Sequence, residues 1–180
     1  ALHTPGPERA GRKVTVGWTG SRSTLKYLKS LGTVLQRLAE NHPDVQFIFI
    51  ADEDPGLPLT NAAFIRWTKE TEIEDLARID IGIMPLPDDA WTRGKCGFKA
   101  LQYMAMGIPA VLSPVGVNKA IVEHGVHGYL CAKDEEWLLC LGELIRDAGK
   151  RREMGLRGRK KVIDHYSVAV NADKFLSLFR

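Results

Sequence analysis

The sequence predicts an α/β fold, a three-layer α/β/α domain of Rossmann-like type in which helices cover both faces of a parallel sheet. Short apolar, β-branched segments alternate with helical patterns about six times along the 180-residue chain, which is typical of βα units. The connections between them carry no two-residue hairpin signal. Residues 45–51 are apolar almost throughout, as expected for a strand that is covered on both faces.

Each element follows from a local pattern. Leucines recur at steps of three and four from Leu25 to Leu38, which predicts a helix there, and the Asn-His-Pro-Asp sequence at 41–44 ends it. Further helices are expected at 72–79, from Gly97 to about Met106, from 117 to about 123, and from 134 to 180. Strands are expected at 14–18, 45–51, 63–68, 81–84, 108–112 and 128–131.

Composition excludes several classes of protein. The chain is 44% hydrophobic and 26% charged, which is ordinary for a globular domain. Its 25 basic and 22 acidic side chains leave a net charge of +3, whereas a nucleic-acid-binding protein is usually more basic. No apolar run approaches the ~18 residues of a membrane span, and the first residues lack the apolar core of a signal peptide.

The cysteines indicate a reducing environment. Cys96, Cys131 and Cys140 show no Cys-x-x-Cys spacing, so neither a zinc site nor a disulfide framework is expected. We therefore expect a cytoplasmic location.

Residues 1–12 differ in character from the rest. They are polar, contain prolines and lack an initiator methionine. We interpret them as a linker or boundary segment before a domain at 13–180, and we expect the chain to be a piece of a longer protein.

Positive charge is concentrated between Arg146 and Lys161, where eight basic residues stand against Asp147 and Glu153. Two interpretations are open. The cluster is a solvated helix face, or it is a docking patch for a partner domain or for an anionic membrane, which would make the protein membrane-peripheral.

Three loops that follow predicted strands are candidates for a ligand site, because ligands of parallel sheets bind beyond the carboxyl ends of the strands. In the first loop, Gly20 and Ser21 could offer N–H or hydroxyl groups to an anion. The third loop contains Ser113 and Gly116. An ordinary helix-capped turn is the alternative for the first loop.

The second loop carries the strongest signal. Gly94 and Gly97 flank a helix start, and Lys95, Lys99 and Gln102 have the spacing of one helix face. Two lysines at a helix N-terminus are unfavourable, because the helix dipole already makes that end positive. A bound diphosphate would neutralise this positive charge. The alternative is a pair of solvated surface lysines.

Aromatic and acidic residues near these loops have two interpretations each. Trp18, Trp67 and Trp91 could stack on a base or sugar, or pack beneath the loops. Asp88 and Asp89 could contact sugar hydroxyls, or form a turn. The histidines show no metal-ligand spacing, so no metal is expected.

Residues 94–116 resemble the donor-binding half of GT-B glycosyltransferases, specifically the large retaining group 1 family that uses nucleotide-activated sugars. Gln102-Tyr-Met-Ala-Met-Gly-Ile-Pro109 falls on the family's Glu-Ala-Met-Ala-x-Gly-x-Pro block. Gly125-Val-His-Gly-Tyr-Leu130 is similar to the family's Asn-Gly-x-x-Gly-Leu/Phe segment. The resemblance covers residues 13–180.

The resemblance implies a C-terminal domain that binds a nucleotide-diphosphate sugar, while an N-terminal acceptor domain of the same parent chain completes the enzyme. The implied reaction transfers the sugar to a glycan, lipid or other acceptor, in bacterial glycoconjugate assembly. No cofactor or metal is implied, and the isolated domain is expected to be inactive.

Two departures from the family pattern shape the predicted site. The family's paired glutamates, which contact the donor sugar and the ribose hydroxyls, fall at Gly94 and Gln102. Its Gly-Arg-Leu…Lys-Gly diphosphate pair is also missing, and Trp18-Thr-Gly-Ser21 stands in that place. We therefore predict that Lys95 and Lys99 act as the catalytic cations, stabilising the departing diphosphate. The predicted binding residues are Gly20, Ser21, Trp67, Thr68, Gly94, Gly97, Gln102, Ser113 and Gly116, with the base near 66–68.

Two other functions stay open. The missing glutamate pair is compatible with a degenerate, non-catalytic nucleotide-binding domain. A GT-B nucleotide-sugar epimerase is the other alternative, and it would need catalytic carboxylates and a histidine in the cleft.

Overall fold

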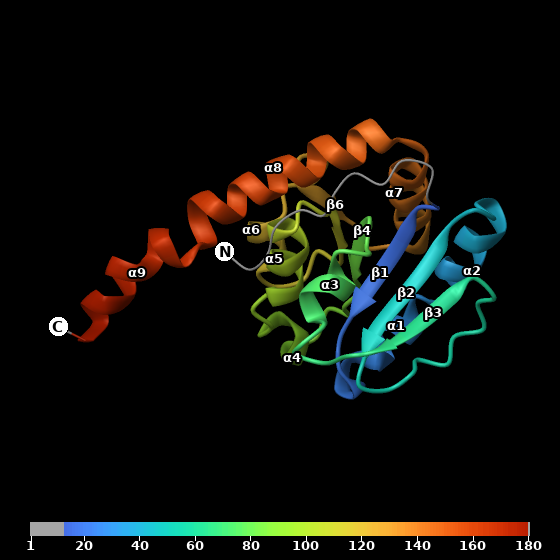
Figure 1. Cartoon of the computed structure of the whole chain (residues 1–180), viewed down its shortest axis with the longest axis horizontal. Coiled ribbons are helices and arrows are strands. Elements are labelled where there is room, and N and C mark those ends of the chain that lie inside the picture. Colours follow the sequence, from blue (N-terminus) through green and yellow to red (C-terminus); the bar gives the residue numbers. More distant parts are fainter. Residues whose placement is uncertain (1–12, 180) are drawn as a thin grey trace.

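The protein folds around a six-stranded parallel sheet, and the computed structural model describes residues 13–179 (Figure 1). The predicted boundary segment at 1–12 lies outside the described residues. The strands are β1 (Thr15–Thr19), β2 (Gln46–Ala51), β3 (Ala62–Arg66), β4 (Ile81–Met84), β5 (Ala110–Leu112) and β6 (Gly128–Leu130). All six predicted strands are confirmed, with small shifts at their ends.

The strand order β3-β2-β1-β4-β5-β6 creates one switch point. The chain moves outward from β1 to β2 and β3, and then returns to the opposite side of β1 to place β4, β5 and β6. The connections that leave the carboxyl ends of β1 and β4 therefore run in opposite directions. Open α/β sheets bind their ligands in the crevice that results.

Helices cover both faces of the sheet. They are α1 (Leu25–Ser30), α2 (Gly32–Asn41), α3 (Glu72–Leu76), α4 (Ala90–Arg93), α5 (Phe98–Ala105), α6 (Asn118–Ile121), α7 (Asp134–Arg146), α8 (Ala148–Tyr166) and α9 (Val168–Leu176). Phe47 and Phe49 of β2 share a core with α1, α2 and α7, whereas Ile48 and Ile50 share the other core with α3, α5 and α6. The apolar run at 45–51 is thus buried on both sides, as predicted.

The prediction of one helix from Leu25 to Leu38 is wrong at Leu31. That residue has φ −90° and ψ 2°, and it separates α1 from α2. Leu31 is nevertheless buried, so the leucine spacing continues across the break and hides it. The helical pattern from 134 onward is likewise divided, at Asp147 and Ser167, whose side chains cap α8 and α9.

Helix α8 crosses the molecule from α7 past α5 (Figure 1). Three of its cationic side chains bind carbonyls of neighbouring helices. Arg151 donates to two carbonyls in the last turn of α7, Arg159 to the last carbonyl of α5, and Lys161 to a carbonyl of α6. Cations are favourable where helix carbonyls lack partners. These three members of the basic cluster therefore join helices, which neither sequence interpretation anticipated.

Other members of the cluster form ion pairs within the chain. Lys150 pairs with Glu143, Arg157 lies 2.5 Å from Glu153, and Lys160 lies 2.6 Å from Asp164.

Helix α9 extends away from the sheet (Figure 1), and none of its residues is buried. Its exposed apolar side chains include Val168, Val170, Phe175 and Leu176. Among residues 13–179, no helix combines the length and the apolar character needed to cross a membrane.

Candidate functional site

Tyr103 of α5 bridges the two central strands, β1 and β4, at the switch point. Its hydroxyl accepts a hydrogen bond from the backbone N–H of Thr19 at 3.1 Å and donates to the carbonyl of Ile83 at 3.3 Å. It thus ties the carboxyl end of β1 to that of β4. Burial raises the pKa of Tyr103, so the hydroxyl stays neutral and acts as a structural bridge.

The first loop uses its backbone N–H groups internally. The N–H of Gly20 donates to the Ile50 carbonyl at 2.9 Å, and the N–H of Ser21 donates to Oγ1 of Thr24 at 3.0 Å. A side chain at position 20 would collide with the ring of Trp18. Neither N–H group is free to bind an anion here, so this loop offers the Ser21 hydroxyl rather than a cradle of amides.

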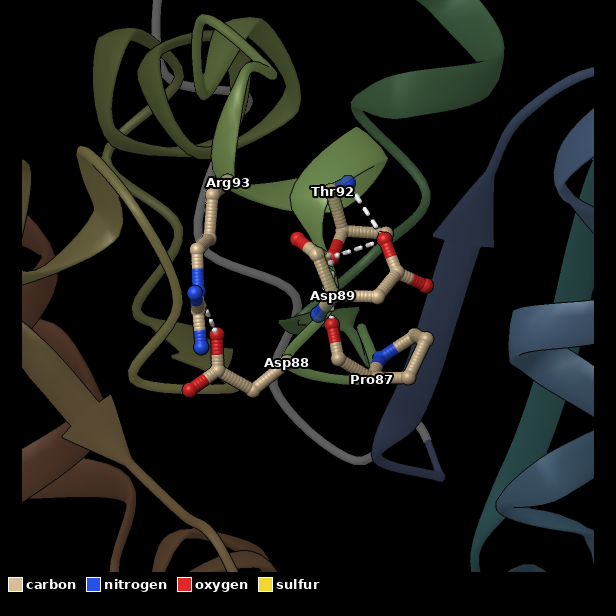
Figure 2. Close-up of polar contacts among 5 residues, drawn as sticks. All are labelled: Pro87, Asp88, Asp89, Thr92 and Arg93. Carbon is tan, nitrogen blue, oxygen red and sulfur yellow. Dashed lines mark hydrogen bonds and ion pairs between the residues drawn. The ribbon is translucent and has the colours of Figure 1, made fainter.

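The second loop is held in shape by its two aspartates (Figure 2). The Asp89 carboxylate caps α4 by accepting from the N–H of Thr92 at 2.7 Å, and Asp88 pairs with Arg93 at 2.6 Å. The Thr92 hydroxyl also donates to the carbonyl of Pro87 at 2.5 Å. These bonds lower the pKa of Asp89, chiefly through Thr92, and of Asp88, chiefly through Arg93. The turn interpretation of this aspartate pair is confirmed.

The loop leads into the N-terminus of α5. Gly97 adopts φ +68° there, a conformation that favours glycine, and a side chain at this position would collide with Ile121. Gly94 is exposed, and its N–H donates to the Trp91 carbonyl at 3.3 Å. The first N–H groups of a helix have no partner within the helix, so α5 begins with donors beside the switch point.

Lys95 and Lys99 lie together at this helix start. Lys99 is largely withdrawn from water, and burial, followed by the charge of Lys95, lowers its pKa. Its Nζ lies 6.0 Å from the centre of the Trp18 ring, and Nζ of Lys95 lies 5.9 Å from that of Trp91. Among residues 13–179, no carboxylate is within 4.0 Å of either ammonium group. Two neighbouring cations without an anion are electrostatically unfavourable.

Gln102 is placed differently from the sequence expectation. It is buried, and its Nε2 donates to Oε1 of Glu72 at 3.0 Å. Glu72 begins α3, which follows β3 and reaches the same edge of the sheet. Glu72 was not predicted from the sequence, because only the packing of α3 beside α5 brings this carboxylate to Gln102.

The third loop is locked onto the second. Oγ of Ser113 accepts from the N–H of Leu86 at 2.9 Å, and Ser113 is buried. Gly116 has φ +53°, and a Cβ there would lie 2.6 Å from the carbonyl oxygen of Arg93. In this structure, Ser113 and Gly116 hold neighbouring loops together at the rim of the site.

The tryptophans divide into two kinds. Trp18 is 2% exposed and belongs to the core, so packing is the interpretation that the structure bears out for it. Trp67 is 41% exposed and Trp91 is 74% exposed, and both rings are therefore accessible to a ligand. Trp67 and Thr68 follow β3, two strands away from β1, and the Thr68 hydroxyl bonds that of Thr71 at 2.8 Å.

No cluster of three or more His, Cys, Asp or Glu side chains suited to a metal ion occurs within the described residues. The charge at the switch point is instead cationic and comes from lysines. Such a site suits an anionic ligand, in particular one with phosphate groups.

Sequence comparison decides the family. Residues 13–147 match the family described as Glycosyl transferases group 1. The chain belongs to this family. A curated relative, spore coat protein SA of Bacillus subtilis (strain 168), is 22% identical over 191 residues, covering 94% of this chain and 49% of the relative. The group 1 chain described here thus spans about half the length of that relative.

Solved structures share the GT-B type of α/β fold. The C-terminal domain of the group 1 glycosyl transferase LpcC from Francisella tularensis has a TM-score of 0.73 and 19% identity, over 93% of this chain and 97% of that chain. TarM from S. aureus, solved with UDP, has a TM-score of 0.79 and 18% identity, over 100% of this chain and 38% of that chain. HepE from Anabaena, solved with UDP and glucose, has a TM-score of 0.76 and 19% identity, over 98% of this chain and 53% of that chain.

Proposed function

We propose that this group 1 domain binds the nucleotide-diphosphate sugar of a retaining glycosyltransferase. The observation that carries the proposal is the pair of ammonium groups of Lys95 and Lys99 at the start of α5, which have no carboxylate partner within 4.0 Å in the described part of the chain, residues 13–179. They stand at the switch point, where open α/β sheets bind ligands. The complexes of TarM and HepE with UDP make UDP a reasonable first probe.

The chemistry assigned to the two lysines is electrostatic. When the bond between the anomeric carbon and the diphosphate breaks, negative charge accumulates on the departing nucleoside diphosphate. Preorganised cations stabilise that charge more strongly where they are shielded from water, and Lys99 is partly buried. Donors from the first turn of α5 add to the same field. In this proposal the lysines supply the positive charge, and no metal or other cofactor is required.

The remaining predicted residues take supporting roles in the proposal. The Ser21 hydroxyl and the N-terminal turn of α5 after Gly94 and Gly97 contact phosphate oxygens. The exposed Trp67 ring and the backbone at Thr68 lie where the nucleoside base would extend.

We further propose that Glu72 and Gln102 bind the ribose together. A ribose presents adjacent hydroxyl donors, and a carboxylate accepts from such donors better than a neutral amide does. Gln102 carries no charge, but its amide holds Glu72 in place.

The acceptor site belongs, in this proposal, to an N-terminal domain of the parent chain. Two observations support it: the chain spans about half of its curated relative, and α9 carries exposed apolar side chains that a second domain could cover. The acceptor is a glycan, a lipid or another molecule of bacterial glycoconjugate assembly. The isolated domain is then inactive.

A cytoplasmic site of action is part of the proposal and is supported by the free cysteines. Peripheral membrane contact is not assigned to the basic cluster on α8, because six of its cations contact other groups of the chain.

One observation favours a second candidate, a non-catalytic nucleotide-binding domain. Neither Gly94 nor Gln102 offers the carboxylate that the family pattern has at these positions. The epimerase alternative has no comparable support.

Calorimetric titration with UDP, GDP, ADP and UDP-glucose, and with uridine for comparison, tests the proposal. We expect at least one diphosphate to bind, and uridine alone to bind far more weakly. No binding by any of them would contradict a donor site. Sugar transfer by the full-length parent protein would then separate the enzyme from the non-catalytic candidate.

A further inference from the structure

Lys26 brings a third ammonium group to the switch point. It lies in the first turn of α1, directly after the loop that leaves β1. Its Nζ is 5.1 Å from the centre of the Tyr27 ring, and Nζ of Lys95 is 5.6 Å from the same centre. Tyr27 is buried, so one fixed ring has a lysine from α1 and a lysine from the second loop beside it.

The two nearby carboxylates, Asp88 and Asp89, already have hydrogen-bond or ion-pair partners other than Lys26. Asp89, the carboxylate that senses the charge of Lys26, has its pKa lowered mainly by the backbone hydrogen bond from Thr92, which it caps. Asp88 is paired with Arg93. Among residues 13–179, no carboxylate lies within 4.0 Å of Lys26.

Three cations thus gather at one corner of the molecule: Lys26, Lys95 and Lys99. They come from two helices and a loop that lie far apart in the sequence, and the charge of Lys95 already disfavours that of Lys99. Contact with aromatic rings offsets part of this repulsion. An anion with several charges would offset the rest, because each ammonium group would then face a negative oxygen.

We propose that Lys26 is a third cation of the diphosphate site, and that it makes the site select a diphosphate over a monophosphate. The proposal rests on the donor-binding function given above. Lys95 and Lys99 stand at the start of α5, on the connection that leaves β4, whereas Lys26 stands in the first turn of α1, on the connection that leaves β1. A diphosphate has a second phosphate group to place between these two sides, and a monophosphate does not. Lys26 therefore stabilises the complex with a diphosphate and not the complex with a monophosphate.

The chain provides a matched control for this assignment. Lys29 lies on the same short helix and is exposed, but it is in the last turn, away from the switch point. Lys26→Ala and Lys29→Ala change the net charge by the same amount. Any difference between them therefore reports position, because a general effect of charge on anion binding would be equal in both.

The test is calorimetric titration of the wild-type chain and the two variants with UDP, UMP and inorganic pyrophosphate. We expect Lys26→Ala to weaken UDP and pyrophosphate about fivefold, the size expected for one charge-assisted contact that is partly exposed to solvent. UMP affinity should change less than twofold, and Lys29→Ala should leave all three ligands near the wild-type value. Circular dichroism and the thermal midpoint confirm that each variant is folded.

The outcomes separate this inference from the proposed function. If Lys26→Ala behaves like Lys29→Ala while Lys95→Ala and Lys99→Ala lose UDP binding, the role of Lys26 is overturned and the donor site stands. If UMP and UDP weaken equally in Lys26→Ala, the selectivity is overturned. If the wild-type chain binds none of the nucleoside diphosphates, both proposals fail.

Discussion

Nε2 of Gln102 donates to Oε1 of Glu72 across 3.0 Å, and this bond joins α5 to α3 at the edge of the sheet. Where the family pattern has a glutamate, this chain has a buried amide that holds a carboxylate from another helix. In the proposed site, the carboxylate therefore comes from α3 rather than from α5.

The first prediction concerns the ribose. Glu72→Gln keeps the shape of the side chain but removes its charge, so hydroxyl groups of the ligand should bind less tightly. We expect wild-type protein to prefer UDP over 2′-deoxy-UDP by about tenfold, and the variant to lose most of that preference. Competition titration measures both ratios. Glu74→Gln, an exposed position on the same helix, is the control. A preference that survives in Glu72→Gln would contradict the assignment.

The second prediction concerns pH. Burial, and then the charge of Lys95, lowers the pKa of Lys99 below the ordinary lysine value. Anion binding needs the ammonium form, so the contribution of Lys99 is complete only below its lowered pKa and is lost as the pH rises through that pKa. We expect the ratio of UDP affinities between wild type and Lys99→Ala to approach one before the pH reaches the ordinary lysine pKa. A ratio that stays constant up to about pH 10 would contradict this linkage.

The third prediction uses the exposed cysteine beside the two lysines. Cys96 is exposed, whereas Cys131 and Cys140 are buried. Iodoacetamide should therefore modify one cysteine rapidly, and saturating UDP should slow that reaction severalfold by covering the start of α5. Peptide mass spectrometry identifies the modified residue and its rate. An unchanged rate with UDP bound would place the nucleotide elsewhere.

The fourth prediction concerns the packing of α8. Gly155 faces the carbonyl of Gly107 so closely that a Cβ would collide with it. We expect Gly155→Ala to lower the free energy of unfolding by about 1–3 kcal/mol. Gly149→Ala is the control, because a Cβ there meets its nearest neighbour at 3.4 Å and alanine favours a helix. Urea denaturation compares the two, and equal midpoints would argue against tight packing at Gly155.

Much of the fold was predictable because its signals are local. The apolar run at 45–51 and the loop glycines identified strands and connections without knowledge of their neighbours. The break at Leu31 was not predicted, because a buried leucine continues the helical spacing through it. The ends of α7 and α8 at Asp147 and Ser167 depend on capping bonds that single residues make.

The site was predictable only in part. Two lysines at a predicted helix start conflict with the helix dipole, and that conflict was visible in the sequence. Glu72 and Lys26 carry no such signal, since their importance arises from which elements lie beside α5. The hydrogen bond from the Gly20 amide to the Ile50 carbonyl also depends on tertiary structure, whereas that from the Ser21 amide to Thr24 is local.

The binding constant of UDP for Lys95→Ala/Lys99→Ala tests the central claim most directly. We expect a loss of at least about tenfold relative to wild type, because two charge-assisted contacts are removed. Lys29→Ala combined with Lys174→Ala, which removes two distant charges, should stay near the wild-type value. An affinity of the Lys95/Lys99 double variant equal to that of wild type would contradict a diphosphate site at the start of α5.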